Sequence, residues 1–262
     1  ATNSNVELLH LALPLGISFF TFTQIAYLID SYREETKEYD LLNYGLFVTF
    51  FPHLLAGPIL HHKEMMPQFD RARNKVINYQ NIVEGLGLFF IGLFKKVVIA
   101  DNLALWANAG FDHSNTLSLF EAWATSLSYT FQLYFDFSGY SDMAIGVGKM
   151  FGFELIENFN YPYISKSVSE FWRRWHISLT TWFRDYVFYP LEFKRRKQKV
   201  FRTESNTLIV FFLTGFWHGA GWQFIAWGLW HGLFSSLEAF LRVKKVKTKA
   251  PTIVRYLVTM LI

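Results

Sequence analysis

The 262-residue chain is too apolar for an ordinary water-soluble domain: 52% of its residues are hydrophobic and 19% aromatic, including 29 phenylalanines. It has no cysteine, which excludes thiolate nucleophiles, CxxC redox motifs and cysteine metal sites. The formal net charge of +4 comes from short basic clusters between apolar runs, which suits the positive-inside rule better than nucleic-acid binding. These features predict an all-α, polytopic membrane protein with substantial loops.

We interpret residues 1–262 as a single membrane-embedded domain that belongs to a longer chain. No basic region precedes the first apolar run, so no signal peptide is visible. The final residues, VRYLVTMLI, begin an apolar run without completing it. We therefore expect helices to be missing at both ends.

Four apolar segments are about as long as the roughly 20 residues that cross a bilayer. In the second of them Pro52 and Pro58 should break a regular helix. Lys95 and Lys96 close the third, where their side chains can reach an interface. The four segments are residues 8–29, 41–59, 82–100 and 117–137.

The fourth segment runs into DFSGYSDMAIGVGKMFGF, which is polar and rich in glycine. Irregular backbone is tolerated at membrane depth only where it lines a cavity or is buried in protein, so we expect broken helices around a cavity here. Asp136 and Asp142 are candidates for orienting a histidine or lining a hydrophilic tunnel. The alternative is a polar pair that stabilises the broken helices.

Residues 169–189 predict one amphipathic helix for the membrane interface or for packing across a bundle, because tryptophan and leucine recur near helical spacing. Arg173 and Arg174 lie between these apolar positions. They are candidates for holding the phosphates of a donor or an anionic lipid, and the alternative is that they anchor the helix at the interface. The preceding segment, residues 158–163 (NFNYPY), predicts a loop, since the residue before Pro162 is biased away from helix.

Two basic clusters, residues 194–202 and 242–249, flank an apolar segment at 207–240. Both clusters should prefer the cytoplasm, so this segment should enter and leave on one side as a hairpin. Its first limb, ending at Trp217, is roughly 16 Å long as a helix, about half of a ~30 Å hydrocarbon core. His218 is therefore expected inside the membrane, near the turn, where water reaches it only through a cavity.

His218 is the main candidate for catalysis. An ionisable group at membrane depth marks a functional site by default, and the flanking Gly219 and Gly221 let a ligand approach the backbone. A neutral imidazole is the usual general base for removing a hydroxyl proton. The alternative is a core histidine that hydrogen-bonds a carbonyl, but the depth and the glycines favour a site.

The other histidines carry weaker signals. His176, in RRWHISL, is either a second site residue or an interfacial histidine beside the arginines. His231 lies thirteen positions after His218, which is roughly 20 Å along one straight helix, so it is not expected in the same step. His61 and His62 look like loop residues. No HxxxH or HxxE spacing joins the histidines, so no metal site is expected.

Seven stretches in chain order carry a resemblance that covers nearly the whole sequence: LPLGISFFTFTQIAYLID, FFPHLLAGPILHHKEMMPQF, GLFKKVVIADNLA, LYFDFSGYSDMAIGVGKMFGF, ENFNYPY, FWRRWHISLTTWFRDYVFYPL and FWHGAGWQFIAWGLWHG. They resemble the membrane-bound O-acyltransferase (MBOAT) family and, within it, the branch of the bacterial alginate O-acetylation protein.

This resemblance implies an all-α transmembrane helical bundle of the MBOAT type. It places the invariant histidine of the family at His218 and the second site residue, usually His or Asn, at His176. It implies that the two face one another in a tunnel, with an acyl donor on the cytoplasmic side and an acceptor on the outer side. The further candidates for lining the tunnel or binding the donor are Arg173, Arg174, Asp136, Asp142 and Trp217.

On this resemblance we expect a multi-pass acetyltransferase of a bacterial inner membrane. It would move an acetyl group from acetyl-CoA towards an exported, alginate-like polysaccharide, with no bound cofactor. A separate periplasmic acetyltransferase would complete the transfer to the sugar, and membrane lipid would surround the bundle. No nucleic-acid partner is expected.

Two other functions compete with acetyl transfer. The D-alanyl transfer branch of the same family modifies teichoic acids, but LAGPILHHKEMMPQF favours the alginate-like branch. A proton-coupled transporter could relay protons through intramembrane His and Asp, yet no inverted repeat is visible. The absence of Walker, dinucleotide-binding and GxSxG motifs disfavours nucleotide-driven transport and serine hydrolysis.

Overall fold

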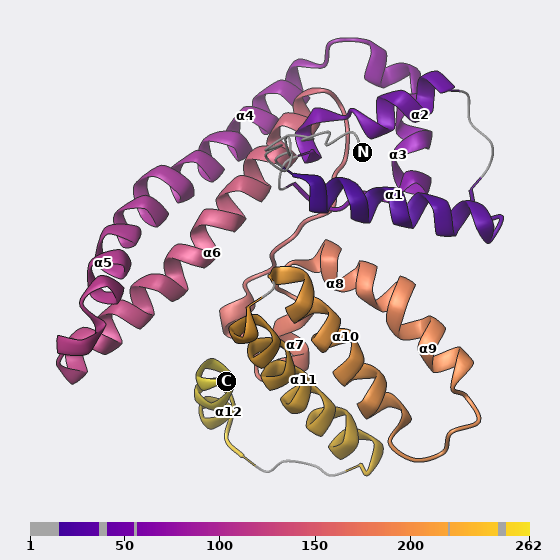
Figure 1. Ribbon diagram of the computed structural model, residues 1–262. Coiled ribbons are helices and arrows are strands. Elements are labelled where there is room, and N and C mark those ends of the chain that lie inside the picture. The colour runs from indigo at the N-terminus through magenta and orange to yellow at the C-terminus, as the bar shows by residue number, and fades with distance from the viewer. Residues whose placement is uncertain (1–15, 37–40, 55–56, 220, 246–249) are drawn as a thin grey trace, which may run out of the picture.

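The computed structural model describes residues 16–36, 41–54, 57–219, 221–245 and 250–262. Every regular element within these ranges is helical, as the sequence predicted (Figure 1). None of the helices in the described ranges combines the length and the apolar character that crossing a membrane requires. The start of the first predicted span, residues 8–15, lies outside the described part of the chain.

The described part of the chain up to residue 150 contains six α-helices. They are α1 (Ile17–Tyr32), α2 (Leu41–Val48), α3 (His62–Phe69), α4 (Tyr79–Phe94), α5 (Asp101–Asp112) and α6 (Leu119–Met150). Short 3₁₀ turns occur at Phe51–His53, Ala72–Lys75 and Ser114–Thr116, and a π-helical turn, Lys95–Ala100, joins α4 to α5. The second apolar segment breaks after Val48, at the prolines, as predicted.

The second half contains shorter helices followed by a helical hairpin. Its elements are a 3₁₀ turn at Pro162–Ile164, α7 (Val168–Trp172), α8 (Ile177–Phe183), a π-helical turn at Arg184–Phe188, α9 (Tyr189–Lys194), α10 (Arg202–His218), α11 (Trp222–Val243) and α12 (Thr252–Leu261).

Helices α4, α5 and α6 form a long hairpin that projects from the rest of the molecule (Figure 1). The backbones approach closely where Gly92 of α4 faces Gly139 of α6. A Cβ atom on Gly92 would lie 2.5 Å from the Gly139 carbonyl oxygen and 2.8 Å from the Met143 nitrogen. Beside this contact the Lys95 ammonium and the Asp142 carboxylate form an ion pair of 2.5 Å. Small residues and a charge pair therefore hold the two arms together.

The prediction of broken helices after residue 135 is wrong, because α6 runs without interruption from Leu119 to Met150. The glycines in this stretch do not end the helix; Gly139 and Gly146 provide flat contact surfaces for α4. A Ser118–Glu121 capping box fixes the start of the helix.

The prediction of one amphipathic helix at 169–189 is also wrong. The chain leaves the helical conformation after Trp172 and resumes it at Ile177. At His176 the backbone is left-handed, with φ 44° and ψ 58°, and a left-handed residue cannot continue a right-handed helix. The amphipathic character remains, but it belongs to two helices, α7 and α8, that can face different neighbours.

The core beside this turn is aromatic. Trp182 of α8 packs against Phe22 of α1, with ring centroids 4.6 Å apart, and donates a hydrogen bond of 3.0 Å from its indole nitrogen to the Phe22 carbonyl. Burying such rings supplies much of the packing energy, and the paired N–H removes the penalty for a buried donor. The buried residues of this cluster are Phe22, Ala26, Ile59, Leu179, Trp182, Phe183 and Tyr186.

The predicted reversal of the chain near His218 is present, as a hairpin of two helices. Helix α10 ends at His218 and α11 begins at Trp222, and the two helices lie side by side (Figure 1). Gly215 and Gly228 meet at the contact, where a Cβ atom on Gly215 would lie 3.2 Å from the Gly228 Cα atom. The hairpin therefore depends on small residues, as the α4–α6 hairpin does.

Replacing Gly92 with alanine should lower the free energy of unfolding of the full-length protein by about 1–3 kcal/mol, because the new methyl group meets backbone atoms that cannot move aside. Thermal unfolding of the detergent-purified protein measures the effect. Gly87→Ala is the matched control on the same helix, since nothing lies within 4 Å of its Cβ position. Equal stability of the two variants would contradict the close packing of the hairpin.

Candidate active site

His176 is held in the interior at the start of α8. The residue is only 4% exposed, and its Nε2 atom is buried without a hydrogen-bond partner among the described residues. Phe137 of α6 packs edge-on against the imidazole, with ring centroids 4.7 Å apart, and Phe19 of α1 lies at 6.2 Å. The ring thus lies between two helices that are distant in sequence.

His218 has the opposite environment. It is the last residue of α10 and is exposed. Its ring contacts Trp217 at 4.6 Å and Trp227 of α11 at 4.9 Å, measured between centroids. The imidazole is therefore accessible to a substrate while the neighbouring indoles restrict its position.

The structure brings the two candidate histidines together from segments 42 positions apart. The Trp217 ring contacts the imidazole of His218, with centroids 4.6 Å apart. Phe19 connects the two sides, because it contacts both His176 and Trp217, the latter at 6.3 Å between centroids. Trp217 also packs on Phe22 of the aromatic core, at 5.2 Å. His176 and His218 are thus linked through Phe19 and Trp217, and their joint role in a site stays a prediction.

His231 also lies near this pair, because the chain turns back at Gly219. The ring of Trp227 contacts both His218 and His231, at 4.9 and 5.2 Å. The estimated separation along one straight helix therefore does not apply. The Nδ1 atom of His231 is buried and has no partner in the described part of the chain.

A cavity of about 250 Å³ extends between α7, α8, α10 and α11. His176 lies in its wall, and so do Arg184 and Arg242. The lining is mainly apolar and carries several hydroxyl groups, as is typical of a pocket for an elongated organic ligand. The lining residues are Ser169, Trp172, His176, Leu179, Thr180, Phe183, Arg184, Phe188, Thr203, Thr207, Val210, Phe211, Thr214, Ser235, Ala239 and Arg242.

The two arginines that the sequence singled out do not line this cavity. Arg173 is exposed at the end of α7. Arg174 is engaged locally: its guanidinium pairs with Glu170 at 3.0 Å and donates to the Asn160 carbonyl at 3.1 Å. Hydrogen bonds from the Lys166 N–H and from Arg174 lower the pKa of the Glu170 carboxyl below its ordinary value. Sequence reasoning missed Arg242, whose only signal was its place in the second basic cluster.

The two aspartates lie with lysines on the α4–α6 hairpin. Asp136 forms an ion pair of 2.6 Å with Lys96, and Asp142 pairs with Lys95. These contacts agree with the alternative interpretation, in which the two carboxylates stabilise helices. The helix that carries them, α6, is continuous and not broken. Across the described residues, no group of three His, Asp or Glu side chains converges as metal ligands.

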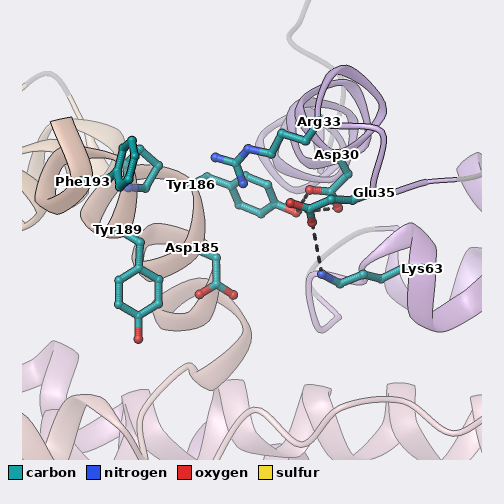
Figure 2. A pocket seen from close by; sticks show the side chains of 9 residues that line it. Asp30, Arg33, Glu35, Lys63, Asp185, Tyr186, Tyr189 and Phe193 are labelled. Atoms are coloured by element: carbon teal, nitrogen blue, oxygen red, sulfur yellow. Dashed lines mark hydrogen bonds and ion pairs between the residues drawn. The ribbon is translucent and has the colours of Figure 1, made fainter.

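A second, polar cavity of about 500 Å³ lies between the end of α1 and α9 (Figure 2). On its wall the Tyr186 hydroxyl donates to the buried carboxylate of Asp30, 2.8 Å from both oxygens, and contacts His61 Nδ1 at 3.2 Å. At the mouth, Lys63 and Glu35 form an ion pair of 3.8 Å (Figure 2). His61 lies in the loop before α3, as predicted, whereas His62 is the first residue of α3, so the loop prediction is wrong for His62. Both residues are buried.

Comparison with known proteins gives one family. The family model described as MBOAT, membrane-bound O-acyltransferase, matches residues 2–261. The chain is 48% identical to the peptidoglycan O-acetyltransferase of Helicobacter pylori, over 98% of this chain and 53% of that protein. It is 48% identical to the probable alginate O-acetylase AlgI of Pseudomonas aeruginosa, over 90% of this chain and 44% of that protein.

A more distant relative is the teichoic acid D-alanyltransferase of Streptococcus thermophilus, which is 32% identical over 90% of this chain and 59% of its own. The chain thus spans about half the length of the curated relatives it matches.

Replacing Tyr186 with phenylalanine should destabilise the full-length protein by about 1–3 kcal/mol, because Asp30, 1% exposed, would lose the hydroxyl that donates to its buried carboxylate. Chemical denaturation of the purified protein measures this loss. Tyr189→Phe, on the exposed side of the same cavity, should change stability little. If the two variants were equally stable, the hydrogen bond between Tyr186 and Asp30 would not contribute to holding α1 against the α8–α9 region.

Proposed function

The chain belongs to the membrane-bound O-acyltransferase family, and we propose that the full-length protein is an acetyltransferase of a bacterial inner membrane. It transfers the acetyl group of cytoplasmic acetyl-CoA for O-acetylation of an exported, alginate-like polysaccharide. The observation that carries this proposal is the series of ring contacts that links His176 to His218, with His176 in the wall of a cavity that two arginines also line. The names of the relatives support acetyl transfer to a polysaccharide-type acceptor.

In this mechanism His218 is the general base. Its neutral imidazole takes the proton from the acceptor hydroxyl as the oxygen attacks the thioester carbonyl of the donor. The C–S bond then breaks, the proton passes from the imidazolium to the leaving thiolate, and free coenzyme A and the O-acetyl ester are formed. The exposed position of His218 allows the acceptor to approach, and the buried His176 is its partner on the donor side.

The cavity supplies the route for the donor. Arg242 lies in the last turn of α11 and Arg202 begins α10, whereas His218 lies at the other end of α10. The 17 residues of α10 span roughly 25 Å. Guanidinium groups bind phosphates through charge-assisted hydrogen bonds, so Arg242 would hold the phosphates of acetyl-CoA while its acyl end extends towards His176. Arg184, in the same wall, is paired with Asp185 at 2.8 Å.

The proposed function implies an orientation of the chain in the membrane. The basic residues near the ends of α9, α10 and α11 would face the cytoplasm, and His218 would lie on the outward side of the site. The acceptor would then be an exported polysaccharide or a hydroxyl of a periplasmic acetyltransferase partner that completes the transfer. The relative that carries out D-alanyl transfer supports a second candidate, in which the donor carries D-alanine and the acceptor is teichoic acid.

Replacing His218 with alanine in the full-length protein should reduce the acetyl content of the exported polysaccharide at least 100-fold, as the loss of a general base typically costs ~10²–10⁴-fold in rate. Acetyl groups released by mild base are measured at matched membrane abundance. His113→Ala, an exposed histidine at the end of α5, is the control. Unchanged acetylation in the His218 variant would contradict the role of His218 as the general base.

Replacing Arg242 with glutamine should raise the KM for acetyl-CoA about tenfold and leave kcat nearly unchanged, because a charge-assisted hydrogen bond to phosphate contributes ~1.5–3 kcal/mol. Initial rates of acetyl transfer in membranes measure both constants. Lys244→Gln is the matched control, since this exposed cation lies two residues further on and outside the cavity. An equal change in both variants would indicate a general effect of positive charge and not a phosphate site.

A further inference from the structure

The left-handed turn at His176 is held by hydrogen bonds on both of its sides. Before the turn, the Asn160 N–H donates to the Arg174 carbonyl at 2.9 Å. After the turn, the Ile177 N–H donates to the Asn158 carbonyl, also at 2.9 Å. The segment 158–160 therefore pairs with the chain around His176 much as one strand pairs with another. Its two bonds flank His176, the residue with a left-handed backbone.

The side chain of Asn158 reinforces this pairing. Its Oδ1 atom accepts hydrogen bonds from the Ser178 N–H at 3.1 Å and from the Ser178 hydroxyl at 2.7 Å. The same hydroxyl accepts from the Ile59 N–H at 3.0 Å, and the Asn158 Nδ2 atom reaches the Ser141 hydroxyl at 3.5 Å. Asn158 thus connects α8 to α6 and, through Ser178, to the segment before α3.

This arrangement is costly to build and so must be held by its surroundings. A non-glycine residue in the left-handed region costs about 1–2 kcal/mol, and such strain persists only where neighbouring contacts fix it, often at functional sites. Asn158 and Ser178 are each 1% exposed, so their hydrogen bonds do not compete with water. The strained residue is His176 itself, whose ring direction is set by this backbone.

We propose that Asn158 is a positioning residue for His176. It fixes the backbone at His176 so that the imidazole remains between Phe19 and Phe137, beside the cavity and close to His218. This inference rests on the proposed function, because it assigns Asn158 a role through His176 in acetyl transfer. Asn158 itself does not line the cavity and is not expected to contact the donor.

The test replaces Asn158 in the full-length protein and measures acetyl transfer from radiolabelled acetyl-CoA in membranes of the native host. Asn158→Ala should lower kcat roughly 10- to 100-fold with KM for acetyl-CoA unchanged, because a misplacement of about 1 Å costs up to ~10²-fold. Asn158→Asp keeps an acceptor for both Ser178 groups and should recover most of kcat. Glu157→Ala, at the exposed preceding residue, is the matched control and should behave as wild type.

Three results would overturn the inference: wild-type kcat in Asn158→Ala, an increase in KM in place of a decrease in kcat, or no recovery in Asn158→Asp. If Asn158→Ala does not accumulate in the membrane, Ser178→Ala provides the same test, since it removes the 2.7 Å bond and leaves the Asn158 side chain intact. His176→Ala separates the two hypotheses. Full activity of that variant would contradict the role proposed for His176, whereas its inactivity beside an active Asn158→Ala variant would contradict only the positioning role.

Discussion

The hydrogen-bonded pairing of residues 158–160 with the chain around His176 is the constraint on which the site depends. Without it, residues 169–189 would satisfy their backbone groups as one continuous helix. The pairing replaces those internal bonds and lets α7 and α8 point to different partners. Trp172 of α7 packs against Phe211 and Trp227 of the α10–α11 hairpin, while Trp182 of α8 packs against Phe22 of α1. The cavity is bordered by α7 and α8 together with the α10–α11 hairpin.

The two histidines then differ in a way that suits different tasks. His176 is enclosed by aromatic rings and fixed by its backbone, whereas His218 is exposed at the end of α10. The first position favours a residue that holds or orients a bound group. The second favours a residue that a substrate can reach. Phe19 and Trp217, which pack together, separate the enclosed side from the open one.

Charged side chains occur in two different settings, the α4–α6 hairpin and the wall of the cavity near His176. On the α4–α6 hairpin, Lys95 and Lys96 pair with Asp142 and Asp136, so these charges neutralise one another and hold helices together. In the wall of the cavity near His176, two arginines accompany hydroxyl groups and apolar side chains. Arg184 is paired with Asp185 at 2.8 Å, so within this set Arg242 is the arginine through which a ligand in the cavity could be bound.

The sequence by itself determined the helical class, the family, the hairpin with His218 at its turn and the two candidate histidines, because these follow from composition, local periodicity and long motifs. The tertiary structure decided the continuity of α6, where glycines lie against α4 and so do not break the helix. It also decided the break at His176, the hydrogen bonds of Asn158 and the place of Arg242 in the cavity wall. Those features depend on hydrogen bonds and contacts between segments far apart in the chain, such as Asn158 with Ser178 and Ile59 with Ser178, which no local pattern records.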